Sequence, residues 1–180
     1  MNTDCSKKKN ILVENQNKVL EETVKARTLE LEEQHRELNY AHRLIVSSVD
    51  YASRLQRAQL PRLQRIEKYF SSFHAIWEPR DTIGGDLYWL SSSRNNGPFI
   101  LCVADCTGHG VPGAFMSMIG VNLLNQIIID KQIHQSNLIL WAIDSALRFL
   151  LRKDETENHD GMDMALVIID KETETLEFAG

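Results

Sequence analysis

Residues 10–59 contain neither proline nor glycine, and strong helix formers such as Glu, Leu, Gln, Arg and Ala dominate them. This run predicts one long helix that ends near Pro61, because proline disfavours the helical conformation in the residue before it. Apolar side chains recur along the helix at a seven-residue spacing: Val24, Leu31, Leu38, Ile45 and Ala52. The companion positions three residues later are half polar: Arg27, Gln34, Ala41, Ser48 and Leu55.

An apolar repeat of seven residues is typical of a coiled coil, and a half-polar second seam predicts that the pairing is weak. We therefore expect residues 1–60 to form a signalling helix that pairs with a second copy of the chain as a parallel homodimer. The alternative is a solvated helix that rests on its own domain along this stripe.

Residues 61–180 have the pattern of an α+β domain. Short apolar and aromatic runs predict strands at 73–77, 87–90, 99–104, 164–169 and 175–178. Two helices are expected between the third and fourth strands, at 111–131 and 136–152. In the second helix Ser136 is the expected cap, with Leu140, Ile143, Leu147 and Leu150 on one face. The order of these elements predicts that the helices cover one face of the sheet.

Residues 106–129 carry no Asp, Glu, Lys or Arg and are long enough to span a bilayer. The run opens with glycines and a proline, and it holds Asn122, Asn125 and Gln126 within its helical part. Backbone and side-chain polar groups of this kind have no partners in lipid, so we expect a core helix and no membrane contact by this segment.

The charge balance and the cysteine content bear on which ligands and which cellular compartment to expect. The chain has 20 Lys and Arg against 25 Asp and Glu, a formal net charge of -5, and no basic stripe beyond residues 7–9. Nucleic-acid binding is therefore not expected. The N-terminus lacks the apolar core of a secretory signal, and the three cysteines have no disulfide-framework spacing. We expect a cytoplasmic chain with reduced thiols.

Two aspartates lie next to glycines at the ends of predicted strands. Asp86 follows Gly84 and Gly85, and Asp105 ends the run at 99–104 and opens a glycine-rich turn. Carboxylates held in this way suit Mg²⁺ or Mn²⁺, which prefer oxygen ligands. An aspartate beside glycine is more often a plain turn residue, so this pattern alone leaves both interpretations open.

A family resemblance favours the metal-site interpretation. The segments PRDTIGGDLYW at 79–89 and VADCTGHGVPGAFM at 103–116, with LQRAQLP at 55–61 before them, resemble the SpoIIE/RsbU-type branch of the PPM (PP2C-like) metal-dependent protein serine/threonine phosphatases. Sensor-linked, SiaA-like bacterial members are the most similar. The resemblance covers about residues 55–180. It implies a layered α-β-β-α sandwich, of which 61–180 would be the N-terminal part.

The resemblance also implies a site and a substrate. Asp86, Asp105 and the carbonyl of Cys106 match ligands of two Mn²⁺ or Mg²⁺ ions, and Arg80 is a candidate phosphate contact. His109 is expected to be structural. The implied substrate is phosphoserine or phosphothreonine on a regulatory protein, such as a STAS-type anti-sigma-factor antagonist. The family's other metal aspartates would follow Gly180, so we expect a truncated domain that is inactive alone. Residues 160–163 are interpreted as a turn.

Three other interpretations compete with a phosphatase. The Gly84-Gly85-Asp86 triplet resembles part of a diguanylate cyclase motif, but Leu87 and Tyr88 lack the acidic and aromatic pair that follows it. Cys102, Cys106 and His109 could ligate zinc by residue type, but the sequence offers no second pair of cysteines or histidines to complete such a site. The strongest alternative is a non-catalytic dimerisation and signal-relay module whose functional part is the long helix.

Overall fold

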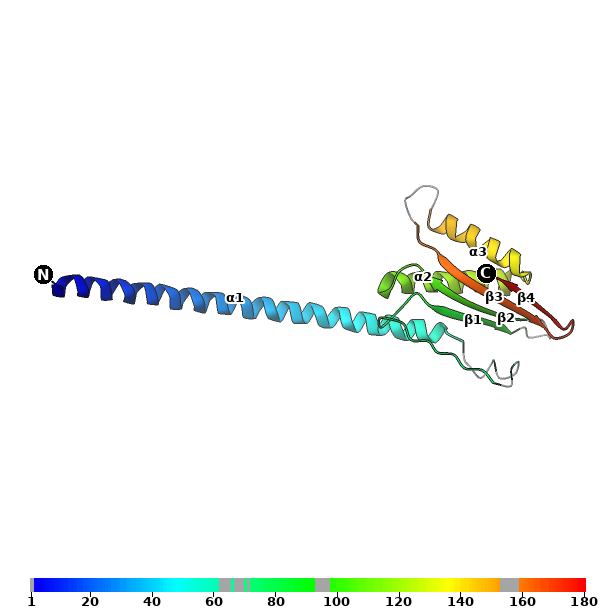
Figure 1. Cartoon of the computed structure of the whole chain (residues 1–180), viewed down its shortest axis with the longest axis horizontal. Helices are drawn as coiled ribbons and strands as arrows, with labels where there is room; N and C mark the ends of the chain where they lie inside the picture. The colour runs from blue at the N-terminus through cyan, green and yellow to red at the C-terminus, as the bar shows by residue number, and fades with distance from the viewer. Residues whose placement is uncertain (1, 62–65, 67–69, 71, 93–97, 153–158) are drawn as a thin grey trace. The chain divides into compact units, whose positions relative to one another are not determined.

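The computed structural model describes residues 2–61, 66, 70, 72–92, 98–152 and 159–180. It divides into an N-terminal unit, Met1–Ser48, and a C-terminal unit, Val49–Gly180. Helix α1, Asn2–Gln59, runs through the first unit and ends in the second (Figure 1). The expectation of one long helix that ends just before Pro61 is confirmed, although the helix begins earlier than residue 10.

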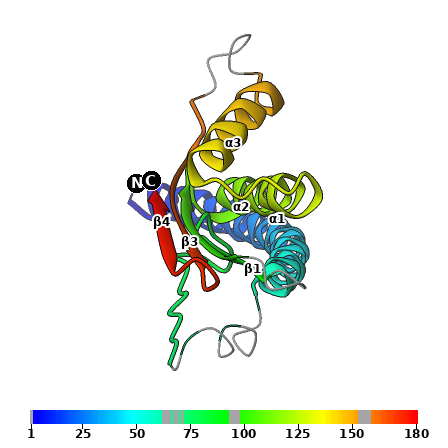
Figure 2. The ribbon, with the colours of Figure 1, turned by 90° about the vertical axis from the view of Figure 1, so that its right-hand side faces the viewer.

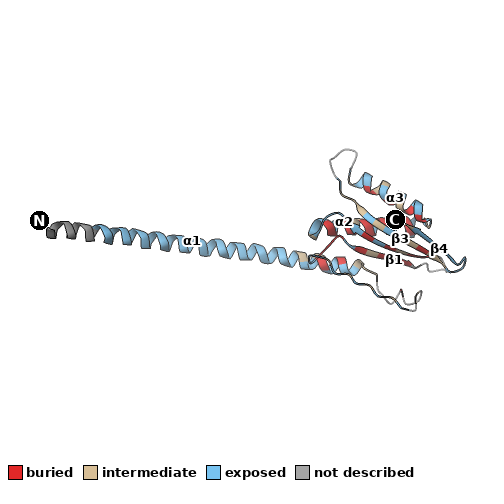
Figure 3. Cartoon of the chain, viewed as in Figure 1, coloured by how far each residue is buried: buried red, intermediate tan, exposed pale blue. Residues whose placement is uncertain are grey.

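The N-terminal unit is helix alone, and every side chain described in it, from residue 12 to residue 48, is exposed (Figure 3). Pairs one turn apart support the helix on its surface, with Arg27 Nη1 2.7 Å from Glu30 Oε2 and Arg36 paired with Glu33. Such exposed pairs contribute little stability each. The apolar stripe therefore has no partner within this unit.

The C-terminal unit holds one antiparallel sheet of four strands in the order β1-β2-β3-β4 (Figure 2). Its strands are β1, Leu87–Ser92, β2, Phe99–Cys106, β3, Met162–Asp170, and β4, Thr175–Ala179. Between β2 and β3 come α2, Gly110–Leu124, a π-helical continuation η2, Asn125–Asp130, and α3, Ser136–Leu150.

The helices cover one face of this sheet, as the sequence predicts. Strand β2 alternates, with Ile100, Cys102, Ala104 and Cys106 buried against the helices and Val103 exposed on the other face. Helix α2 packs with its small-residue face inward, since Gly113, Ser117 and Gly120 are all buried. Gly110–Asp130 is long and apolar enough to cross a membrane, but 56% of its apolar 18-residue window is buried inside the protein. It is the central core helix of this unit.

Three expectations about elements are wrong. Residues 73–77 run extended but pair with no described strand, and Ile76 is 90% exposed. The segment lines a cavity on the open face of the sheet, together with residues of β2 and β3, so it does not extend the sheet at an edge. Ser136 makes no side-chain cap, and its backbone N–H instead donates to Glu177 Oε2 at 3.3 Å. Helix α3 buries Ile139 with Ile143 and Leu147, whereas Leu150 is 53% exposed.

The last turns of α1 belong to the C-terminal unit and pack on it. Val49 and Ala52 are half-buried, and Ser53 and Gln56 are buried. Of the seven-residue stripe, Ala52 therefore packs on the C-terminal unit, whereas the stripe residues before it are exposed.

Candidate metal centre

Three aspartates line up across neighbouring strands at one end of the sheet. Asp86 directly precedes β1, and the register that pairs Leu87 with Ala104 places it beside Asp105 of β2. On its other side, β2 pairs with β3, and that register places Asp105 opposite Asp163. All three are exposed, on the face that the helices leave open. The structure therefore brings the two predicted ligand aspartates together and adds a third.

Asp163 corrects the interpretation of residues 160–163 as a turn. Strand β3 begins at Met162, so Asp163 lies within the strand. Two hydrogen bonds extend the ladder past the predicted start at 164, because Thr107 N donates to Gly161 O and Gly161 N donates to Thr107 Oγ1, both at 2.9 Å. The missed signal is the two-residue alternation, in which Asp163, Ala165 and Val167 share one face.

Glycines let the two ligand-bearing segments approach closely. A Cβ added at Gly85 would lie 2.6 Å from Cys106 O, and one added at Gly113 would lie 2.4 Å from Gly108 O. Gly108 itself has a φ of 93°, which a residue with a side chain rarely adopts. The chain before Asp86 therefore packs directly against the carbonyl of Cys106.

The two neighbouring carboxylates repel one another. Partial burial, and then the charge of Asp105 and a hydrogen bond with it, raise the pKa of Asp86 above its ordinary value. Within the described part of the chain no Lys, Arg or His pairs with either carboxylate. A bound cation would remove this repulsion.

The donor set fits Mn²⁺ or Mg²⁺. Asp86 and Asp105 offer carboxylate oxygens and Cys106 a carbonyl oxygen, and hard divalent ions prefer such ligands. Among the described residues no group of three or more His, Cys, Asp or Glu is arranged to hold an ion. Side chains of these residues therefore do not enclose an ion, and backbone carbonyls, water or substrate oxygens would complete the coordination.

Arg80 and His109 are two further residues that the sequence associates with the site. Arg80 is exposed and makes no ion pair among the described residues, which leaves its guanidinium open to an anion. Asp81 pairs instead with His109, whose Nδ1 is 2.9 Å from Asp81 Oδ2. This contact ties the segment before Asp86 to the turn after Asp105, which agrees with a structural role for His109.

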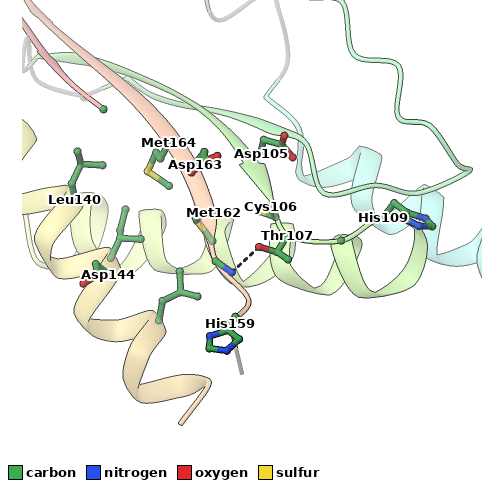
Figure 4. A pocket seen from close by; sticks show the side chains of 15 residues that line it. Asp105, Cys106, Thr107, His109, Leu140, Asp144, His159, Met162, Asp163 and Met164 are labelled. Carbon is green, nitrogen blue, oxygen red and sulfur yellow. Dashed lines mark hydrogen bonds between the residues drawn. The ribbon is translucent and has the colours of Figure 1, made fainter. Parts of the chain in front are cut away.

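Two cavities meet at the aspartates. One of about 1070 Å³ lies between α3 and the start of β3, with Asp105 and Asp163 at its edge and Asp144 and His159 on its wall (Figure 4). The other, about 950 Å³, lies on the open sheet face and is lined by all three aspartates. The site is therefore open to a substrate of considerable size.

The buried thiols are not in this site. Cys102 and Cys106 lie on the core face of β2, and burial raises the pKa of each thiol to about 12. Zinc binds thiolates, so this environment disfavours the zinc interpretation. Only the backbone of Cys106 belongs to the candidate centre.

Comparison with known proteins agrees with this geometry. No protein-family model matches the chain, and no curated protein sequence matches it. Among solved structures, the SiaA-PP2C domain of Pseudomonas aeruginosa is similar, with 35% sequence identity and a TM-score of 0.67. The similarity covers 78% of this chain and 55% of that one, so the chain spans about half the length of this relative. In sequence and in fold together, the chain is PP2C-like and related to SiaA.

Proposed function

We propose that this chain supplies metal ligands and the regulatory helix of a Mn²⁺- or Mg²⁺-dependent protein serine/threonine phosphatase. Its substrate would be phosphoserine or phosphothreonine on a regulatory protein of the STAS type. The single observation that carries the proposal is the placement of Asp86 beside Asp105, with Gly85 packed on the Cys106 carbonyl. The relation to a PP2C domain supports the reaction class. The choice of a STAS-type substrate is supported by the family resemblance alone.

The chain's own residues have distinct roles in this proposal. Asp86, Asp105 and the Cys106 carbonyl would hold two divalent ions, which supply Lewis acidity and an activated water for attack on phosphorus. Trp77 Nε1 donates to Asp86 O at 2.9 Å and so fixes the backbone of the first ligand. The exposed Arg80 would bind a phosphoryl oxygen at the rim.

The direct test is metal binding followed by a phosphatase assay. The wild-type chain is titrated with Mn²⁺ by calorimetry, and phosphate release from a phosphoserine peptide is measured with Mn²⁺ and with EDTA. We expect Mn²⁺ binding by the chain, and metal-dependent phosphate release by a protein that carries a whole PP2C-like domain with this sequence. The 180-residue chain alone should release little or no phosphate, since the family resemblance implies more metal ligands than Asp86, Asp105 and the Cys106 carbonyl. Absence of Mn²⁺ binding would contradict the proposal.

Asp86→Asn should raise the melting temperature of the metal-free protein slightly and abolish its stabilisation by Mn²⁺. The folded protein holds the Asp86 proton more tightly than the unfolded chain does, because the folded-state pKa is raised. The charged form therefore costs stability as pH rises through the range of this carboxyl, and at pH 7 the amide removes that cost. Because Asp86 is largely exposed, we expect a gain of roughly 1–3 °C.

Thermal unfolding at pH 7, with and without Mn²⁺, measures both effects. The same variant should lose the rise in stability that the metal-free wild-type protein shows as pH falls toward 4. An Asp86→Asn protein that is stabilised by Mn²⁺ as strongly as the wild type would exclude Asp86 as a ligand.

A homodimer through α1 is the second part of the proposal. The exposed stripe in the N-terminal unit supports it, since Leu31, Leu38 and Ile45 are 63%, 67% and 64% exposed. The same stripe supports the alternative function, a non-catalytic dimerisation and signal-relay module. Mn²⁺ binding that depends on Asp86 and Asp105 separates the two, because only a phosphatase needs the metal centre.

A further inference from the structure

The last turns of α1 hold the backbone that leads to Asp86. Ser53 Oγ donates to Thr82 O at 3.0 Å, and Gln56 Nε2 donates to Gly84 O at 2.6 Å. In return Gly84 N donates to Gln56 Oε1 at 3.3 Å. Ser53 and Gln56 are only 8% and 5% exposed, although they lie on a helix whose earlier side chains are in solvent. Both belong to the same C-terminal unit as the aspartates.

The Gln56 carboxamide uses both of its N–H donors and its carbonyl oxygen here. Besides the two bonds to Gly84, its Nε2 donates to Ser117 Oγ at 2.9 Å, and the Ser117 hydroxyl donates to Ala114 O at 2.9 Å. Gln56 thus joins the segment before Asp86 to α2, the helix that follows the Asp105 turn. Buried amide bonds of this kind are costly to lose, because the groups left behind have no water to replace the partner.

The same end of α1 reaches Asp86 by a second route. The Arg57 guanidinium lies over the Trp77 ring, 5.4 Å from its centroid, and Trp77 Nε1 donates to the backbone carbonyl of Asp86. Gln56 therefore contacts Gly84 directly, and its neighbour Arg57 contacts Trp77, which in turn bonds to the Asp86 carbonyl.

The packing of the glycine pair explains why this contact bears on the metal centre. A Cβ at Gly84 would lie 2.8 Å from Pro79 Cβ, and a Cβ at Gly85 would lie 2.6 Å from Cys106 O. The segment is thus fitted between Pro79 and the Cys106 carbonyl with no spare room. A shift of Gly84 would move Asp86 relative to Asp105 and to that carbonyl.

We propose that Gln56 is a positioning residue for the carboxylate of Asp86, acting through the backbone N–H and C=O of Gly84. This inference rests on the proposed function, because it assigns Gln56 to the same metal centre. Gln56 would touch neither the metal nor the substrate. Its role is to hold Asp86 beside Asp105, where both carboxylates would serve as metal ligands.

The test replaces Gln56 by methionine in the full chain. Gln56→Met keeps the length and volume of the side chain but removes its three hydrogen bonds. We expect Mn²⁺ affinity, measured by calorimetry, to fall by roughly 10- to 100-fold, the usual effect of losing a residue that orients a ligand. Hydrogen exchange of the amides at 82–86 should accelerate. The matched control is Gln16→Met on the exposed part of α1, which should change neither quantity.

The outcomes separate this inference from the proposed function. Gln56→Met with wild-type Mn²⁺ affinity or with unchanged exchange at 82–86 would overturn the inference. A wild-type chain that binds no Mn²⁺ would overturn both. If Asp105→Asn abolishes Mn²⁺ binding while Gln56→Met does not weaken it, only the positioning role fails.

A second variant covers the case in which Gln56→Met does not fold, as judged by circular dichroism. Ser117→Ala removes one partner of the carboxamide and leaves its two bonds to Gly84 in place. It should shift Mn²⁺ affinity and exchange at 82–86 in the same direction by a smaller factor. No shift in either measurement would overturn the inference on its own.

Discussion

Asp105→Asn should reduce the metal-dependent phosphatase activity of a whole PP2C-like domain with this sequence on the order of 100-fold or more. Asp105 lies between Asp86 and Asp163 in the strand register, so it is the one carboxylate that reaches both neighbours. The amide keeps the size of the side chain but supplies no negative charge to a divalent ion. Fold and stability should change little, because the side chain is exposed on the open face of the sheet.

The measurement is phosphate release from a phosphoserine peptide as a function of Mn²⁺ concentration, with circular dichroism to confirm folding. Asp130→Asn is the matched control, since Asp130 is exposed at the end of η2 that is distant from the Asp105 turn. It should retain wild-type activity. Turnover by Asp105→Asn that approaches the wild-type value at saturating Mn²⁺ would exclude Asp105 as a ligand.

The elements with a strong periodic signal could be predicted from the sequence. The run up to Gln59 contains no proline or glycine and consists of strong helix formers, so its sequence predicts α1. The continuous apolar run at β2 likewise predicts a buried strand. Asp86 and Asp105 could be singled out because glycines flank both of them. Their contact, however, depends on the pairing of β1 with β2, which connects residues far apart in the sequence.

The features missed from the sequence all depend on tertiary partners. The alternation at Asp163, Ala165 and Val167 is compatible with a strand that begins before residue 164, but the start of β3 is set by Thr107 pairing with Gly161, which no local pattern encodes. Residues 73–77 have the composition of a strand, but pairing depends on tertiary context, and the fold places this segment along the cavity on the open sheet face. The role of Gln56 was equally hidden, because a glutamine in a charged helix ordinarily faces solvent.

Leu31→Asp combined with Leu38→Asp should convert a dimer of this chain into monomers and leave the metal centre unchanged. The two leucines are 63% and 67% exposed, so the substitution removes little packing within the chain. In a paired helix each leucine would contribute about 2 kcal/mol by burial, and the change affects both copies. We therefore expect the dissociation constant to rise by at least ~1000-fold.

Sedimentation at about 50 µM, where a weak coiled coil should still associate, measures the effect. The control is Leu29→Asp combined with Val46→Asp, which places the same charges on exposed apolar residues outside the seven-residue stripe. Because only the stripe presents apolar side chains at the spacing of a shared seam, the control should remain dimeric. A wild-type chain that sediments as a monomer at this concentration would contradict pairing, and α1 would then be a solvated helix that rests on its own domain only through its last turns.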